Sequence, residues 1–582
     1  MVNMSRRKLL TIIGVVAIVF IGGLTAILVN NSLRAFSPVA SVPENTMSVS
    51  GQGGNAVAVG EYLYFIGNFV PTASIEYKQN EHNRVTYGAI YRVRLGEDGL
   101  PSYDNTWLEN WSYNYEHRES FLEEIYGDQL NSQVKGKELI VPKIAGFESS
   151  ALWVFGNYLV YTSPNNQMNR FGELQSARID FFRVDLDGRN HRRIYTSDSS
   201  TLTRNDFTVA WVPTSGNSPE GRASGRSYLL INDDGELRRV SISHNLGRVT
   251  TISEAATSFA FPIVTDFEVS PTAQAHTQQK GFGGVMNFVY FTENREETDS
   301  ARGNLMKRFS ISSGNIVTIG RAGSFRYTAH SLSGGAFAFE RACVDNVNPT
   351  ILFIASGSGA TDFHGETWNY YPRFRATDLL QPGYRVILPT WAPAEDTPIV
   401  QRFFMLVEGQ LFTMQRKAAA DVWGNVFSRP DFARTAIALD VAEVIHVSHN
   451  SIYYVNSSGF VVVIDAQGRT NAQRVLENPS LDTLHSGSLG MPPQSRVNEV
   501  NITVFQPRLA NGARNGQNEF FFYMRTIGTV NLPETDPDDP DAEIVHETMT
   551  IPVIVDRNGR SWILAVLDER FVAAPENEIL GD

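Results

Sequence analysis

Seven aromatic residues in two long segments between predicted strands are the side chains best suited to hold a ligand. Tryptophan and tyrosine rings stack on sugar rings and anchor partner proteins, and they also pack a loop onto the sheet below it. Both interpretations apply to segments 104–146 and 357–372. The residues are Trp107, Trp111, Tyr113, Tyr115, Trp368, Tyr370 and Tyr371. If they act in function, the chemistry is ligand binding.

Sequence patterns of catalytic and metal sites are missing. The chain has no Gly-x-Ser-x-Gly elbow, no His-Glu-x-x-His pair and no Walker loop. His446 and His449 are three apart, but they flank a predicted strand end and its turn, so we expect them to face different ways. Segment 533–543 carries acidic residues among prolines, which favours an extended solvated loop over a calcium site. We therefore predict no catalytic residue, no metal and no cofactor.

An uninterrupted apolar run at residues 9–29 follows the basic residues Arg6, Arg7 and Lys8. A helix of this length spans about 31 Å at ~1.5 Å per residue, which matches a hydrocarbon core of ~30 Å. The run is longer than the apolar core of a secretory signal peptide and lacks a small-residue cleavage pattern. It predicts an uncleaved signal anchor in the lipid bilayer, with a cleaved signal as the alternative. Because basic residues stay inside, residues 1–8 form a cytoplasmic stub and the rest is exported.

The chain is acidic, with 62 Asp and Glu against 49 Lys and Arg and a net charge of −13. An acidic surface repels a phosphate backbone, so we expect no nucleic-acid partner. The single cysteine, Cys343, excludes an intramolecular disulfide. A large exported domain of this kind must therefore be held together by its hydrophobic core.

Beyond residue 53, short runs rich in Val, Ile, Tyr and Phe alternate with Gly, Asn, Asp and Ser, a pattern that predicts strands and turns. One kind of apolar strand recurs eight times and is interpreted as the second strand of a repeated unit. The runs are residues 62–66, 158–162, 228–231, 288–291, 351–354, 403–407, 452–455 and 520–524.

The clearest unit predicts strands at residues 441–447, 451–456, 460–465 and 472–476. Repeated four-stranded units are typical of propeller blades. The predicted fold class is all-β: a seven- or eight-bladed β-propeller preceded by one N-terminal transmembrane helix. The expected organisation is a linker at residues 30–53, the propeller at residues 54–570 and a C-terminal tail at residues 571–582. Segment 271–284, which is polar and glycine-rich, is predicted to be a mobile loop.

Short motifs in the chain resemble those of known propeller families. The sequence Tyr-Phe-Thr-Glu at residues 290–293 resembles the Tyr-Trp-Thr-Asp signature of lipoprotein-receptor propellers. Residues 183–188 are similar to the Leu-Asp-Gly ending of that family, and they also resemble bacterial TolB-like propellers and related extracytoplasmic repeat domains. The resemblance implies a propeller over residues 54–570. It implies no ligand.

Two functions fit these features. The first is a non-catalytic binding or scaffold module on the outer side of a cell membrane, with an envelope protein or a cell-wall glycan as partner. The alternative is a glycan-active enzyme that uses two carboxylates at the mouth of the propeller channel. The absence of a reactive sequence cluster favours the first, and the anchor together with the lack of disulfides indicates a bacterial envelope protein.

Overall fold

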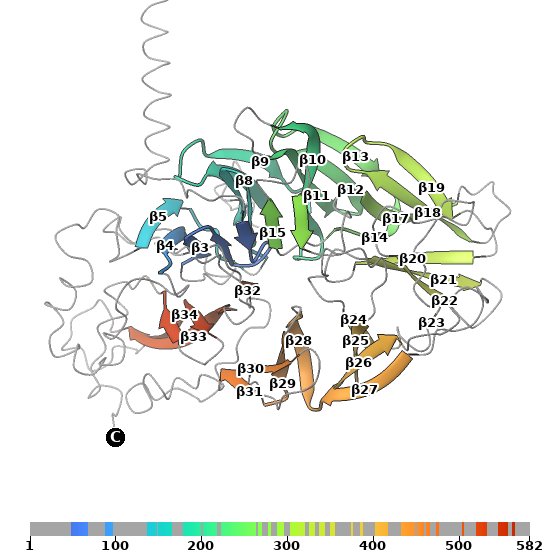
Figure 1. Ribbon diagram of the computed structural model, residues 1–582. Helices are drawn as coiled ribbons and strands as arrows, with labels where there is room; N and C mark the ends of the chain where they lie inside the picture. The colour runs from blue at the N-terminus through green and yellow to red at the C-terminus, as the bar shows by residue number, and fades with distance from the viewer. Residues whose placement is uncertain are drawn as a thin grey trace, which may run out of the picture.

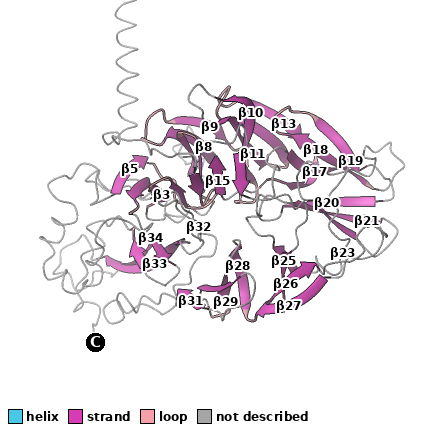
Figure 2. Cartoon of the chain, in the orientation of Figure 1, coloured by secondary structure: helices cyan, strands magenta, loops and turns pink. Residues whose placement is uncertain are grey.

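The computed structural model of the chain contains strands and turns in the part that it describes (Figure 2). No helix among the described residues is long and apolar enough to cross a membrane. The predicted anchor at residues 9–29 lies outside them. The described residues are 48–67, 88–96, 137–141, 143–147, 149–165, 178–199, 202–217, 223–262, 266–269, 277–280, 288–295, 303–320, 325–331, 337–343, 350–354, 374–375, 384–387, 402–416, 432–447, 451–458, 461–465, 473–476, 503–505, 520–531, 545–556 and 561–564.

The strands form eight antiparallel sheets in the described part of the chain, and seven of these sheets have four strands. The first sheet has the order β16 (Thr277–Lys280), β15 (Asp266–Val269), β1 (Ser48–Ser50), β2 (Ala56–Val59), β3 (Tyr62–Ile66), β4 (Ile90–Arg94) and β5 (Lys137–Val141). The second has β6 (Leu152–Phe155), β7 (Tyr158–Pro164), β8 (Ile179–Asp185) and β9 (Arg192–Thr196). The third has β10 (Phe207–Asn217), β11 (Ala223–Asp233), β12 (Glu236–Ser241) and β13 (Val249–Ser253).

The remaining five sheets follow in chain order. The fourth has β14 (Ala256–Ala260), β17 (Phe288–Asn294), β18 (Asn304–Ser310) and β19 (Ile316–Gly320). The fifth has β20 (Phe325–Ser331), β21 (Phe337–Cys343), β22 (Thr350–Ile354) and β23 (Phe374–Arg375). The sixth has β24 (Tyr384–Ile387), β25 (Arg402–Val407), β26 (Gln410–Arg416) and β27 (Phe432–Ala438). The seventh has β28 (Val441–Val447), β29 (Ser451–Asn456), β30 (Val461–Asp465) and β31 (Gln473–Leu476), and the eighth has β32 (Thr503–Phe505), β33 (Phe520–Asn531), β34 (Val545–Asp556) and β35 (Ser561–Ile563).

All eight predicted apolar runs lie in strands, one in each sheet. Seven of them are second strands of their four-strand units, as predicted. The run at residues 351–354 is the exception, because it lies in β22, the third strand of the fifth sheet, and β21 is the second. The unit predicted at residues 441–476 is confirmed to within one residue at each strand end. The position of the second strand could therefore be predicted from the sequence in seven of the eight sheets of the described residues.

The sheets follow one another around a common centre (Figure 1). Neighbouring sheets touch through β2 and β6, through β9 and β12, and through β14 and β20. The last sheet meets the first where β32 contacts β2, and β32 also contacts β28 of the seventh sheet. The strands of each four-strand unit follow one another in chain order, although β15 and β16 of the first sheet are inserted between β14 and β17 of the fourth. Among the described residues, no sheet combines strands from the two ends of the chain. This arrangement of four-stranded antiparallel units is of the β-propeller type.

The first sheet differs from the prediction at both of its edges. Segment 271–284, predicted as a mobile loop, contains β16, which pairs with β15 in a hairpin that adds to the first sheet through β1. The predicted linker at residues 30–53 includes β1 itself, and segment 104–146 includes β5. These strands are short, and β15 and β16 reach the first sheet only by pairing with β1, which is distant in the sequence.

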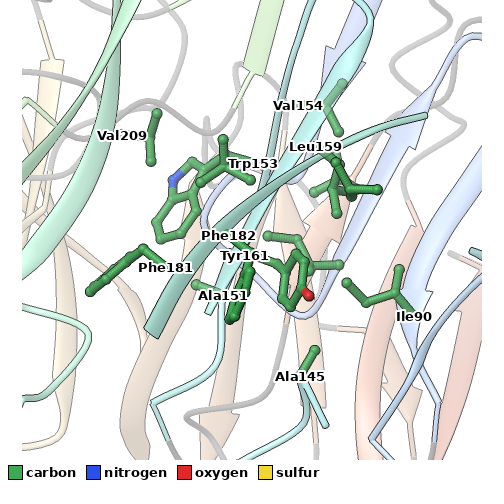
Figure 3. Packing of buried hydrophobic residues seen from close by; sticks show 14 of the residues in the cluster. Ile90, Ala145, Ala151, Trp153, Val154, Leu159, Tyr161, Phe181, Phe182 and Val209 are labelled. Carbon is green, nitrogen blue, oxygen red and sulfur yellow. The ribbon is translucent and has the colours of Figure 1, made fainter. Parts of the chain in front are cut away.

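The largest core cluster lies where the first three sheets meet. The ring of Phe207 packs edge-on against Trp153 and Phe181, with centroids 5.9 and 5.1 Å apart. Figure 3 shows Trp153, Phe181 and Val209 gathered on one side of this cluster. Further clusters join the third sheet to the fourth and the sixth to the seventh. Each buried aromatic side chain contributes about 1.5–3 kcal/mol relative to exposure, so these seams supply much of the stability.

An arginine on the third strand recurs at the seams of the first four sheets. In each sheet its guanidinium lies over the ring that begins the second-strand run, with the carbon of the guanidinium 4.3–4.9 Å from the ring centre. The pairs are Arg92 with Tyr62, Arg183 with Tyr158, Arg239 with Tyr228, and Arg308 with Phe288. An arginine therefore recurs in four of the repeated units, each time diagonally across the strand pair from the aromatic ring that it covers.

Two of these arginines also bond the next sheet. Arg183 donates to the carbonyl of Ile242 at 3.1 Å, and Arg239 donates to the carbonyl of Ile311 at 2.5 Å. Both acceptors are fully buried residues directly after the third strand of the following sheet. In the first sheet, Tyr64 makes the equivalent bond to the carbonyl of Leu186. A cationic donor to a buried carbonyl satisfies a group that the sheet ladder leaves without a partner.

Candidate functional site

The seven aromatic residues predicted to bind a ligand lie outside the described residues. Their place in the topology is known from the strands that flank them. The first group, which includes Trp107 and Trp111, is in the connection from β4 to β5, and the second, which includes Trp368, is in the connection from β22 to β23. Both connections join the third strand of a sheet to the fourth. Their role as a binding surface stays a prediction.

Within the described residues, several titratable groups with displaced pKa values converge where the first and second sheets meet. The ring of His191 stacks on Phe182, with centroids 4.9 Å apart and planes 8° from parallel. Its Nε2 and the hydroxyl of Tyr161 are 2.5 Å apart. Tyr161 in β7 and Phe182 in β8 are register partners, and His191 ends the turn after β8, so the antiparallel ladder brings the three rings together (Figure 3 labels Tyr161 and Phe182).

Two charged groups complete this cluster, which we call the His191 cluster: Tyr161, Phe182, His191, Lys143 and Asp180. The ammonium group of Lys143, from the connection after β5, lies 4.8 Å from the centre of the Phe182 ring. Asp180, at the start of β8, is buried and accepts hydrogen bonds from Thr196 at 2.6 Å and Asn165 at 3.3 Å. The carboxylate is thus held by neutral donors and is free to act on its neighbours through space.

Burial sets the protonation states in the His191 cluster. Burial, followed by the nearby charge of Lys143, lowers the pKa of His191 to about 4. It raises the pKa of Tyr161 well above its usual value, helped by the carboxylate of Asp180. The pKa of Lys143 is lowered by burial, partly offset by Asp180. At neutral pH the histidine and the tyrosine are both uncharged, and their hydrogen bond needs no charge on either side.

This arrangement constrains the chemistry that the cluster can perform. A general base works best when its pKa lies near the working pH, and a histidine with a pKa of about 4 is a weak base at pH 7. A buried tyrosine with a raised pKa is a correspondingly weak acid. The pair is suited to packing and to hydrogen bonding of a neutral group. Perturbed groups gathered at one place are nevertheless the kind of feature that marks functional sites.

A second buried polar cluster has a structural role. Asp233 at the end of β11 is fully buried, and it accepts hydrogen bonds from the hydroxyl of Tyr195 at 2.6 Å and from the backbone N–H groups of Asp198 and Ser199. Arg238 bonds Asp198, Glu236 and Tyr195, and these acceptors raise its pKa despite the opposing effect of burial. The carboxylate thus fastens the end of the second sheet to the third.

Among the residues that the structure describes, no three His, Cys, Asp or Glu side chains come together in a way that would hold a metal ion. Cys343 is the last residue of β21. The sequence search missed the His191 cluster because its members are separated by up to 48 positions (143 to 191) and none belongs to a catalytic motif. One part of the cluster could have been found from the sequence. The repeat predicts that the strands containing Tyr161 and Phe182 are neighbours, as they are in the structure.

No family model and no curated protein matches the chain. Solved structures with some similarity include the polysaccharide lyase Uly1, 11% identical with a TM-score of 0.30 over 73% of this chain and 92% of the other. The β-propeller domain of the Trilobed protease from Pyrococcus furiosus is 10% identical with a TM-score of 0.28, over 65% and 93% of the two chains. The oligogalacturonate lyase from Vibrio parahaemolyticus is 8% identical with a TM-score of 0.28, over 70% and 97%. Scores this low carry no argument about function, and the class, an all-β protein of propeller type, rests on the sheets themselves.

Proposed function

We propose that this chain is an extracytoplasmic eight-bladed β-propeller, tethered to a cell membrane by residues 9–29, that acts as a non-catalytic binding or scaffold module. Its partner is an envelope protein or a cell-wall glycan. The eight sheets of the described residues support the blade number. The apolar run with its preceding basic cluster supports the tether and the outward orientation of the propeller.

One observation supports the proposal that the module is non-catalytic. His191 and Tyr161 are bonded to each other and are uncharged near pH 7, so this pair supplies neither an effective acid nor an effective base. The hydrogen bonds that Asp233 accepts likewise serve to hold the second and third sheets together. Function is then left to the long connections, which are the usual location of binding residues on a rigid scaffold.

The test is retention of partners by the detergent-solubilised full chain on cell-wall glycan and on envelope extract. Replacing Trp107, Trp111 and Trp368 with Ala is expected to abolish retention and to leave the thermal unfolding midpoint unchanged. A triple Ala variant that binds as well as the wild type contradicts the role of these residues. The matched control is Trp153→Ala, which removes a core ring and is expected to lower the midpoint.

The second candidate function is a glycan-active enzyme, and the His191 cluster is the observation that favours it. Histidine, tyrosine, lysine and carboxylate side chains converge there, the set from which acid and base catalysts are drawn. Incubation of the chain with acidic and neutral glycans, followed by detection of new chain ends, tests it. Loss of cleavage in both His191→Gln and Lys143→Met supports an enzyme that uses this cluster. If both variants still cleave glycan, the activity belongs to another site.

A further inference from the structure

The exposed apolar side chains of the described residues are unevenly distributed over the ring. Five large ones are exposed, and four of them lie on the outermost strands of the third and fourth sheets or on the turns before these strands. Their exposed fractions are 37% for Leu246, 44% for Val249, 46% for Ile316 and 43% for Val317. With Arg248, which is also exposed, they form what we call the turn-face patch.

The two halves of the turn-face patch are adjacent in space. Arg239, on the seam between the third and fourth sheets, bonds Thr250 next to Val249 and also the carbonyl of Ile311 in the turn before Ile316. On the other side, the turn at Gly247 lies against the carbonyl of Ile194 in β9, whose first residues, Arg192 and Arg193, are exposed. The patch therefore continues into a pair of exposed arginines.

The charge around the patch is opposite to that of the chain as a whole. Residues 241–253 and residues 304–320 contain no acidic side chain, although the chain has 62 of them and a net charge of −13. Arg248 faces solvent between Leu246 and Val249 in the sequence, and Arg192 and Arg193 face solvent on β9, the strand that the turn at Gly247 approaches. Basic and apolar side chains exposed together are the combination that binds the surface of an anionic bilayer.

In the first two sheets, the third strand ends beside the turn between the first and second strands of the unit. In the first and second sheets, the residue after the third strand bonds back to the first turn: Leu95 to the carbonyl of Glu61, and Leu186 to the carbonyl of Asn157. The bonds from Arg183 to Ile242 and from Arg239 to Ile311 align these sheet ends through the third and fourth sheets.

The first strand of the chain fits this direction. Val49 of β1 pairs with Val59 at the end of β2, so β1 begins at the first-turn end of its sheet, the end from which the turn-face patch also projects. Between residue 29 and β1 lie residues 30–47, which span at most about 60 Å when extended at ~3.3–3.6 Å per residue. A short tether keeps the patch near the bilayer and makes its binding an intramolecular event at high effective concentration.

We propose that the turn-face patch docks on the surface of the anionic bilayer that holds the chain's own anchor. The proposal rests on the membrane tether of the proposed function. The proposal adds an orientation of the propeller. The ends of the sheets that carry the turn-face patch face the bilayer. The opposite ends, where the second strand of each unit connects to the third, face away from it.

The experiment uses the full chain, with its one cysteine removed by Cys343→Ser, in vesicles of phosphatidylcholine with or without phosphatidylglycerol. A fluorophore is placed at Ser313→Cys, an exposed position in the turn before β19, or at Glu254→Cys, an exposed position at the opposite end of the third sheet. Quencher-labelled lipid headgroups then report proximity. We expect strong quenching at position 313 and little at position 254 in anionic vesicles, with the difference lost at ~1 M salt, where the Debye length is ~3 Å.

Variants of the patch have a matched control. Arg248→Gln is expected to lower the ratio of docked to undocked protein about fivefold, the effect of one basic residue at an anionic surface. Leu246→Ser is expected to reduce docking as well. Leu439→Ser, which removes the fifth exposed apolar side chain at the turn between β27 and β28 on the other face, is expected to leave docking unchanged.

The possible failures are distinguishable. Chains that do not float with vesicles refute the tether and therefore the proposed function. Chains that float but show equal quenching at the two positions refute the docking alone. A third outcome also refutes bilayer docking. In it, an acidic wall polymer shields position 313 from a soluble quencher while lipid headgroups do not quench it, and the patch then binds that polymer.

Discussion

Replacing Arg183 with Met tests whether the repeated arginines hold the ring together. Arg183 lies over the ring of Tyr158, 4.3 Å from its centre, and donates a hydrogen bond of 3.1 Å to the carbonyl of Ile242 in the next sheet. Methionine keeps the apolar stem of the side chain and removes the charge and the donor. The carbonyl of Ile242 belongs to a fully buried residue and would lose its cationic donor.

The magnitude follows from these contacts. A hydrogen bond from a charged donor contributes about 1.5–3 kcal/mol. The contact with the tyrosine ring adds about 0.5–1 kcal/mol at a partly exposed site. The retained stem recovers part of this loss through packing, so we expect Arg183→Met to lower the free energy of unfolding by about 2 kcal/mol.

Arg192→Met is the matched control. Arg192 is the register partner of Arg183 on β9, is exposed, and changes the net charge by the same amount when replaced. Urea unfolding followed by circular dichroism gives both midpoints, and the slope should be unchanged. Exchange of the Ile242 amide, which donates to the carbonyl of Ser227, should quicken in Arg183→Met as the seam opens more often. Equal midpoints for the two variants, with unchanged exchange, would refute a structural role for the repeated arginines.

Two further predictions concern the same sheets. Because the pKa of His191 is about 4 in the fold and ~6.5 when unfolded, the unfolded state binds more protons between these values. Stability should therefore fall by up to about 3 kcal/mol as the pH drops from 6.5 to 4, and a His191→Phe variant that keeps the full slope contradicts this. Gly225→Ala should cost about 1–3 kcal/mol, since a Cβ there would lie 1.9 Å from the Trp211 ring; an unchanged urea midpoint contradicts it.

The repeat of apolar second strands could be predicted because its cause is local. A strand with one or both faces buried shows its pattern of apolar residues in four or five consecutive positions, as residues 62–66 and 452–455 do. The turns between strands have equally local causes: Gly188 and Gly235 adopt positive φ angles of 83° and 84° in tight turns. These features predicted an all-β fold of repeated units before any long-range contact was known.

The strands that extend the first sheet could not be predicted in this way. β15 is a short strand that pairs with the edge of β1, more than 200 positions away in the sequence, and the polar segment β16 pairs with β15 in turn. The fifth sheet was misread for a related reason. Residues 351–354 have the apolar pattern of a second strand, and only the pairing of β21 with β20 assigns the order.

The sequence alone determined that the chain is built from repeated short strands, that residues 9–29 are apolar enough to span a bilayer, and that no known catalytic motif is present. Only the tertiary structure decided which polar groups meet. His191, Tyr161 and Lys143 become neighbours through sheet register and the seam between sheets, and so do the arginines and the carbonyls they bond. The physical reason is that strand propensity and turn chemistry act over a few residues, whereas seams between sheets join side chains that the sequence separates by tens of positions.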